Sequence, residues 1–174
     1  MPSDDTLVIG HAASGKSAWA ESMVLAMAAE AGGRAVYVAT AAVLDGEMRA
    51  RVAAHTARRG QDWDLIETPP DLALACAARR QKETVLVDCA TLWLTSLVIA
   101  GRDWRGPAEA WIDAMATSPA RFVVVTNDVG GGVVPDNALA RRFQRDQGAL
   151  NQMLAAAMPR VVVVTAGLPL WLKR

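Results

Sequence analysis

The sequence predicts an α/β fold, in which a mostly parallel β-sheet carries helices on both faces. Six strand-like runs of apolar and β-branched residues recur along the 174 residues, and helical patterns separate most of them. The runs that begin at Thr84, Phe122 and Val161 are continuously apolar rather than alternating, which is typical of strands covered on both faces. The sequence therefore predicts parallel strands that are joined by crossover helices.

The first predicted strand, Thr6–Ile9, enters a glycine-bounded loop, and a helical run from Lys16 to about Ala31 leaves it. Trp19, Met23 and Met27 recur at a spacing of four in this run, which predicts one helix face. The remaining predicted strands are Ala35–Ala39, Leu65–Glu67, Thr84–Val87, Phe122–Thr126 and Val161–Val164.

The length and composition of the chain indicate how many domains it forms and which partners and compartments are expected. A chain of 174 residues predicts one domain, residues 1–174, large enough for a sheet covered on both faces. Lys plus Arg and Asp plus Glu number 18 each, so no basic excess favours a nucleic-acid partner. No apolar stretch predicts a membrane span or a secretory signal, which favours a cytoplasmic protein. Cys76 and Cys89 lack metal-ligand spacing and are expected to be buried thiols.

The loop after the first strand fits the phosphate-binding pattern G-x-x-x-x-G-K-[ST], since it reads Gly10-His11-Ala12-Ala13-Ser14-Gly15-Lys16-Ser17. Its glycines let the backbone approach a polyphosphate, and the helix N-terminus supplies N–H groups. Lys16 adds positive charge, and the Ser17 hydroxyl is suited to Mg²⁺. The sequence therefore predicts a P-loop NTPase fold of the RecA-like type that binds a nucleoside triphosphate.

In parallel sheets, ligands bind beyond the carboxyl ends of the strands, so the residues there are candidates for chemistry. Those ends include Ala39-Thr40-Ala41, Glu67 and Asp88. Asp88 closes an apolar strand, as does the carboxylate that holds Mg²⁺ in NTPases. It also precedes a predicted helix at Ala90, where an aspartate is a favoured N-cap. Both roles stay open at this point.

His55 belongs to a segment, Asp45–Arg59, that predicts a helix because it contains no glycine or proline after Gly46. Arg51 and Arg59 flank His55 at a spacing of four, and Arg58 follows one turn later. One interpretation is a solvated basic face. The other is a nucleophilic imidazole that the arginines keep neutral, while their guanidinium groups bind phosphate. The spacing alone leaves both open.

Further segments extend these motifs over nearly the whole chain. They are Tyr37-Val-Ala-Thr-Ala41, Asp45-Gly-Glu-Met48, His55-Thr-Ala-Arg-Arg59 with Trp63 and Glu67, Val87-Asp-Cys-Ala-Thr-Leu-Trp-Leu94, Thr126-Asn-Asp-Val-Gly130, Gly132-Val-Val-Pro135, Arg142-Phe-Gln-Arg-Asp-Gln-Gly148 with Asn151, and Ala166-Gly-Leu-Pro-Leu170 with Lys173. In this series and order, the chain resembles the bifunctional adenosylcobinamide kinase and adenosylcobinamide-phosphate guanylyltransferase family of cobalamin biosynthesis.

The resemblance implies two reactions. ATP or GTP phosphorylates the aminopropanol hydroxyl of adenosylcobinamide, and GMP then passes from GTP to adenosylcobinamide phosphate through a guanylylated histidine, which matches His55. It also implies Mg²⁺ and a homotrimer. The implied catalytic residues are His55 and Lys16, and the implied metal ligands are Ser17 and Asp88. The implied nucleotide contacts are Gly10, His11, Ala12, Ala13, Ser14, Gly15, Lys16, Ser17, Ala39, Thr40, Ala41, Thr56, Ala57, Arg58, Arg59, Glu67 and Asp88.

The sequence departs from the family pattern in the P-loop, where His11 and Ala13 replace a glycine and an arginine. Two other functions are weighed against the bifunctional enzyme: a P-loop kinase with a single activity, and a non-catalytic module that switches with its nucleotide. Trp93 and Trp104 are further candidates to border the flat corrinoid.

Overall fold

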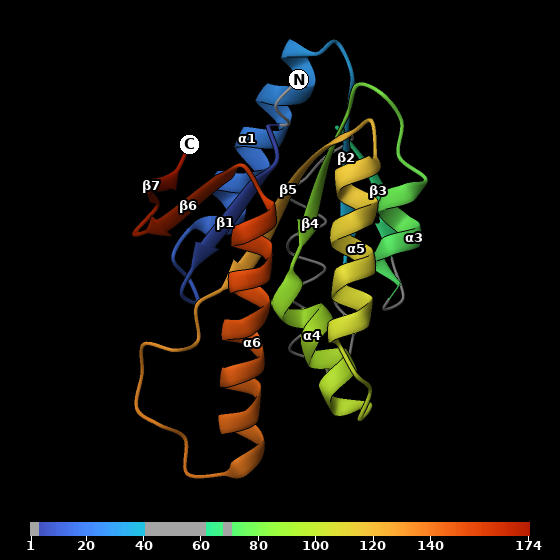
Figure 1. Ribbon diagram of the computed structural model, residues 1–174. Coiled ribbons are helices and arrows are strands. Elements are labelled where there is room, and N and C mark those ends of the chain that lie inside the picture. Colours follow the sequence, from blue (N-terminus) through green and yellow to red (C-terminus); the bar gives the residue numbers. More distant parts are fainter. Residues whose placement is uncertain (1–3, 41–61, 68–70) are drawn as a thin grey trace.

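Seven strands form one sheet in the order β3-β2-β4-β5-β1-β6-β7 in the computed structural model, which describes residues 4–40, 62–67 and 71–174 (Figure 1). The strands are β1 Thr6–Gly10, β2 Arg34–Ala39, β3 Trp63–Glu67, β4 Glu83–Asp88, β5 Arg121–Asn127, β6 Arg160–Thr165 and β7 Leu168–Lys173. All neighbouring strands are parallel except β6 and β7. The mostly parallel sheet and its first six strands are therefore confirmed.

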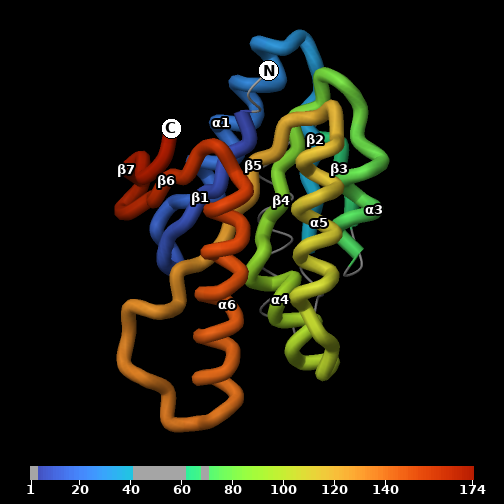
Figure 2. The backbone as a smooth tube through the Cα atoms, in the orientation of Figure 1, coloured from blue at the N-terminus to red at the C-terminus, as the bar shows by residue number. Residues whose placement is uncertain are grey.

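Helices cover both faces of the sheet, as predicted. They are α1 Lys16–Glu30, α3 Leu72–Ala77, α4 Ala90–Ile99, α5 Arg105–Thr117 and α6 Ala138–Ala157. Helix α1 packs on one face, where Val24 joins the buried strand residues Val8 and Val125. Helices α3 to α6 build the core on the opposite face (Figure 2). The long β5–α6 connection extends beyond the carboxyl ends of the strands in both views.

The antiparallel strand β7 was not predicted. It contains Pro169, and Leu168, Leu170 and Leu172 are each more than 60% exposed, so it lacks the apolar burial of the other strands. Proline is tolerated there because β7 forms an edge of the sheet, where one side of the strand needs no backbone partner. A sequence pattern that identifies buried strands misses such a strand.

Two tryptophans that were candidates for the ligand surface are buried in the core instead. Trp93 and Trp104 are 1% and 2% exposed, and the Trp93 ring packs against Trp111 with centroids 5.4 Å apart. The proposal that they border a corrinoid is wrong, because their rings are enclosed in the α4–α5 layer. In α1, the predicted stripe of Trp19, Met23 and Met27 divides: Met27 is buried in the core with Ala20 and Val24, whereas Trp19 and Met23 are partly buried and pack against it.

The two cysteines are buried, as expected, and burial raises the pKa of each thiol to about 12. Because the thiolate is the reactive form, we expect Cys76 and Cys89 of the native protein to react with a disulfide reagent at about pH 8 only as fast as the chain opens. Denaturant should release both thiols at once. Reaction of the native protein within the mixing time would contradict this burial.

The raised pKa values of the two thiols also determine how the free energy of unfolding should change with pH. Their pKa values are higher in the folded chain than in an unfolded one, so folding keeps both groups protonated. Their contribution is fully present below the usual thiol pKa of about 8.5, and the free energy of unfolding should fall as the pH rises above it. Denaturant titrations across this range test the slope.

Candidate functional site

The P-loop is a tight turn between β1 and α1. Gly15 has φ +88°, a left-handed conformation that favours glycine, and it is the N-cap of α1. The first helical bond described at this end runs from Trp19 N to Gly15 O at 3.0 Å. The amides of the first helical turn have no acceptor one turn back, so they are available to an anion.

Contacts from distant segments hold this loop in shape. Gly167 N donates to Ser14 O at 2.8 Å, and Asp128 N donates to Gly10 O at 3.1 Å. A Cβ at Gly10 would lie 2.5 Å from Ser14 Oγ and 2.7 Å from Val164 O, which leaves room for glycine alone. Ser14 Oγ is itself buried and has no hydrogen-bond partner among the described residues. The loop is therefore braced by the ends of β5 and β6.

Lys16 crosses the loop from the first turn of α1. Its ammonium donates to His11 O at 3.0 Å, and the residue is 8% exposed. Burial lowers the pKa of Lys16, and the neighbouring Cys89 and Asp88 oppose that shift when they are ionised. A positive charge held against a backbone carbonyl in so little water favours a stronger anionic partner.

The structure excludes one of the two roles of Asp88 that the sequence left open. Helix α4 begins at Ala90 with Cys89 as its N-cap, and no side chain caps it, so the N-cap alternative is wrong. The Asp88 carboxylate instead accepts a hydrogen bond of 2.5 Å from the Tyr37 hydroxyl. Asp88 is therefore oriented by the neighbouring strand β2 rather than by the helix that follows it.

Strand register brings three predicted site residues together at the carboxyl edge of the sheet. Ala39 is opposite Glu67 of β3 on one side and Asp88 of β4 on the other. The next residue, Thr40, is buried, and its hydroxyl donates to Cys89 O at 2.7 Å and accepts from Cys89 N at 2.8 Å. Across the sheet, Gly10 pairs with Asn127. The P-loop and the ends of β2, β3 and β4 thus share one edge.

A family model described as cobinamide kinase / cobinamide phosphate guanyltransferase matches residues 6–172. The chain belongs to this cobinamide kinase / guanyltransferase family. Two curated relatives agree with the assignment. The bifunctional adenosylcobalamin biosynthesis protein CobP of Pseudomonas aeruginosa is 43% identical over 96% of each chain. Its counterpart CobU of Escherichia coli is 34% identical over 96% of this chain and 98% of its own. The resemblance stated from the motifs is confirmed.

A solved structure shares the fold at low sequence identity. The flagellar accessory protein FlaH of Methanocaldococcus jannaschii has a TM-score of 0.53 and 11% identity, over 99% of this chain and 80% of that one. A likeness at this identity shows the arrangement of elements and nothing about activity.

Part of the family's expected site lies outside the described residues. This holds for the predicted helix Asp45–Arg59 and so for the histidine that the family resemblance implies, His55. It also holds for the expected nucleotide contacts Ala41, Thr56, Ala57, Arg58 and Arg59. The remaining expected contacts lie along one sheet edge, except that the His11 side chain is exposed and its Nδ1 lies 3.1 Å from Asp128 O.

A buried polar cluster beside the P-loop strand was not foreseen. Thr126 Oγ1 donates to Asn151 Oδ1 at 2.7 Å and accepts from Gln147 Nε2 at 3.0 Å. Asn151 Nδ2 donates to Asn127 O at 3.0 Å, and Asn127 N donates to Thr91 Oγ1 at 2.9 Å. These bonds fix the last residue of β5, opposite Gly10. The sequence signal is a glutamine and an asparagine at helical spacing of four.

Two features are absent from the described part of the chain. Within residues 4–40, 62–67 and 71–174, no group of three or more His, Cys, Asp or Glu side chains is arranged to hold a metal ion. Among the helices in those ranges, none is both long enough and apolar enough to cross a membrane.

Proposed function

We propose that this chain phosphorylates adenosylcobinamide and then transfers GMP to the resulting phosphate, with one domain performing both reactions at the P-loop edge of the sheet. One observation carries the proposal: a buried Lys16 spans a complete P-loop, and the Asp88 carboxylate is close enough to act on its charge. Family membership supplies the substrates, cobinamide and cobinamide phosphate.

Phosphoryl transfer requires mainly positioning and charge neutralisation. Lys16 would leave the His11 carbonyl for the β- and γ-phosphates of the donor, and the amides of the first helical turn would bind the same oxygens. The aminopropanol hydroxyl then attacks the γ-phosphorus, the bond to the β-phosphate oxygen breaks, and the hydroxyl proton passes to solvent. ADP or GDP is the leaving group.

The donor set also suits Mg²⁺. The Ser17 hydroxyl and the Asp88 carboxylate are the hard oxygen ligands that this ion prefers, and Mg²⁺ completes its shell with water and substrate phosphates. When bound, the ion neutralises charge on the transferring phosphates. The Tyr37 hydroxyl donates to one Asp88 oxygen, which supports this role because it restrains the carboxylate.

GMP transfer benefits from two displacements rather than one. A His55 nitrogen attacks the α-phosphorus of GTP, and pyrophosphate leaves. An oxygen of adenosylcobinamide phosphate then attacks the same phosphorus, and the P–N bond breaks. Arg58 and Arg59 are suited to stabilise the charge on the phosphates. Glu67, Ala39, Thr40, Ala41, Thr56 and Ala57 would contact the guanosine, with the Glu67 carboxylate accepting from the guanine N–H edge.

The resemblance supports a homotrimer, and the exposed edge strand β7 is a compatible contact surface because Leu168, Leu170 and Leu172 lie on it. Light scattering should then give three times the 18.5 kDa chain mass. A monomeric mass at micromolar concentration would contradict it. We place the enzyme in the cytoplasm, where its ATP and GTP substrates are supplied.

The test is a product assay with adenosylcobinamide, Mg²⁺ and either γ-labelled ATP or α-labelled GTP. We expect γ-label in adenosylcobinamide phosphate, α-label in the GDP-linked product, and, without corrinoid, α-label on the protein that mild acid releases. Phosphorylation with no α-label in either product or protein would support a single-function kinase. Nucleotide binding with neither product would support a nucleotide switch.

A further inference from the structure

We propose that the purine base of the phosphoryl donor binds in a cavity between α1 and the β6–β7 turn, on the side of the P-loop away from Glu67. This inference rests on the proposed function, because it concerns the nucleotide whose phosphates occupy the P-loop. It assigns the kinase donor a base position separate from that of the GTP that guanylylates the protein.

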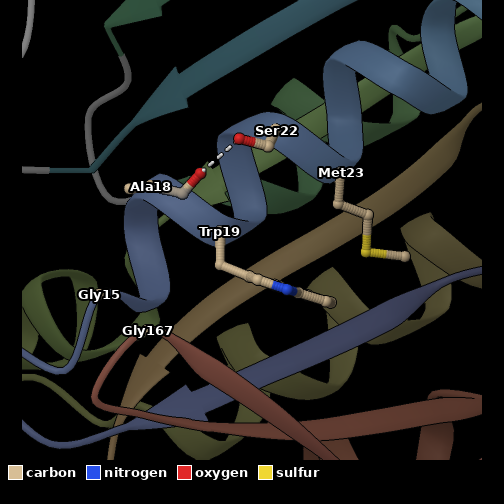
Figure 3. Close-up of a pocket in the computed structure, with 6 residues that line it drawn as sticks. All are labelled: Gly15, Ala18, Trp19, Ser22, Met23 and Gly167. Atoms are coloured by element: carbon tan, nitrogen blue, oxygen red, sulfur yellow. Dashed lines mark hydrogen bonds between the residues drawn. The ribbon is translucent and has the colours of Figure 1, made fainter.

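The cavity is a wide, open depression in the surface, and it adjoins the P-loop directly. It has a volume of about 590 Å³ and is lined by Gly15, Ala18, Trp19, Ser22, Met23 and Gly167 (Figure 3). Gly15 belongs to both the loop and the cavity, and Gly167 donates its N–H to Ser14 O of the loop at 2.8 Å. From Gly15 to Met23 the cavity follows α1 for about 12 Å at the usual helical rise. A single ribose joins the base of a nucleotide to its phosphates. When the P-loop binds the phosphates, the base therefore lies in a surface next to that loop.

The lining has the chemistry of a stacking site. Trp19 and Met23 project from α1 on the same side (Figure 3), and the Trp19 indole is partly exposed. It packs against Trp171 of β7 in an edge-to-face pair, with ring centroids 5.9 Å apart at 71°. An indole that is held by a neighbour and partly exposed suits a planar heterocycle. Ala18 and the two glycines leave the space open, because none of them carries a bulky side chain.

The lining carries few side-chain groups that would read a base edge. Among its six residues none is charged, and the polar side-chain groups are the Trp19 indole N–H and the Ser22 hydroxyl, whose proton is donated to Ala18 O at 3.0 Å. A base held mainly by stacking is weakly discriminated. The cavity therefore accepts adenine and guanine alike, whereas a carboxylate such as Glu67 selects guanine. The Glu67 strand β3 and the β6–β7 turn lie at opposite ends of the sheet order, with β1 and its P-loop between them.

Ser22→Phe tests the assignment, because it fills the cavity from an exposed position of α1 without removing a core contact. We expect KM for ATP in adenosylcobinamide phosphorylation to rise by about tenfold or more, the scale of a lost base stack. Binding of Mg²⁺-tripolyphosphate, which has no base, should be unchanged. Protein guanylylation by α-labelled GTP should be unchanged too. Ala29→Phe is the matched control, since it places the same ring on an exposed site two turns further along α1.

A second pair covers the case in which Ser22→Phe folds poorly. Trp19→Ala should raise KM for ATP about tenfold, whereas Trp19→Phe keeps an aromatic face and should restore most of the affinity. Unchanged KM in both Ser22→Phe and Trp19→Ala overturns the inference and leaves the proposed function intact. Equal losses in phosphorylation and guanylylation overturn the separate base positions. An unmodified protein that makes neither product overturns both the inference and the proposed function.

Discussion

The His55→Ala variant is expected to lose GMP transfer by about 10³-fold or more and to retain phosphorylation of adenosylcobinamide. The loss follows because no nucleophile remains to take GMP from GTP, whereas phosphoryl transfer at Lys16 involves no covalent protein intermediate. Label from α-labelled GTP should disappear from the denatured protein, and γ-label from ATP should still reach the corrinoid.

His55→Asn is the matched second variant, since it keeps a polar side chain but cannot form a stable bond to phosphorus. Both variants should bind GTP and unfold at the temperature of the unmodified protein. If both reactions fell equally in a variant that folds normally, the separate roles of His55 and the P-loop would be refuted.

Lys16→Ala is expected to reduce both reactions by about 10²- to 10³-fold, because both use the triphosphate that the P-loop binds. The Lys16 ammonium is the buried cation that crosses the loop to His11 O. Lys82→Ala is the control, since this exposed lysine precedes β4 at the amino edge of the sheet, away from the P-loop. Parallel assays with γ-labelled ATP and α-labelled GTP measure the two losses.

The pH dependence of kcat/KM is a second test of the role of Lys16. Burial lowers its pKa in the free enzyme, so kcat/KM for the nucleotide should begin to fall, as pH rises, below the usual range of a lysine. Lys16→Ala should remove that limb of the profile. A Lys16→Ala enzyme with normal activity in either reaction would show that the reaction does not use the P-loop.

The strands and the P-loop were predictable because both leave strong local signals: continuous β-branched runs, and glycines followed by lysine and serine at fixed spacing. The meeting of Glu67, Ala39 and Asp88 was only partly predictable. Each could be placed at a strand end, but their adjacency depends on the order β3-β2-β4, which no local pattern contains.

Other features depend on tertiary packing alone. Trp93 was a candidate to border the ligand, and the structure encloses its ring against Trp111, because an aromatic residue gives no local sign of which neighbour covers it. Strand β7 was missed because its leucines are exposed. The cavity beside Trp19 requires the β6–β7 turn to approach α1, a contact between residues about 150 positions apart in the printed sequence.

The two backbone bonds that brace the P-loop have a consequence for how the protein is made. The loop is formed by residues 10–17, but its carbonyls at Gly10 and Ser14 are bonded by Asp128 and Gly167. Strand β1 likewise lies between β5 and β6, which leave the ribosome long after it. A nascent chain therefore carries its phosphate loop from the start without a formed binding site. Competence to bind nucleotide arrives only after Gly167 has been synthesised, with the long-range contacts that also slow folding.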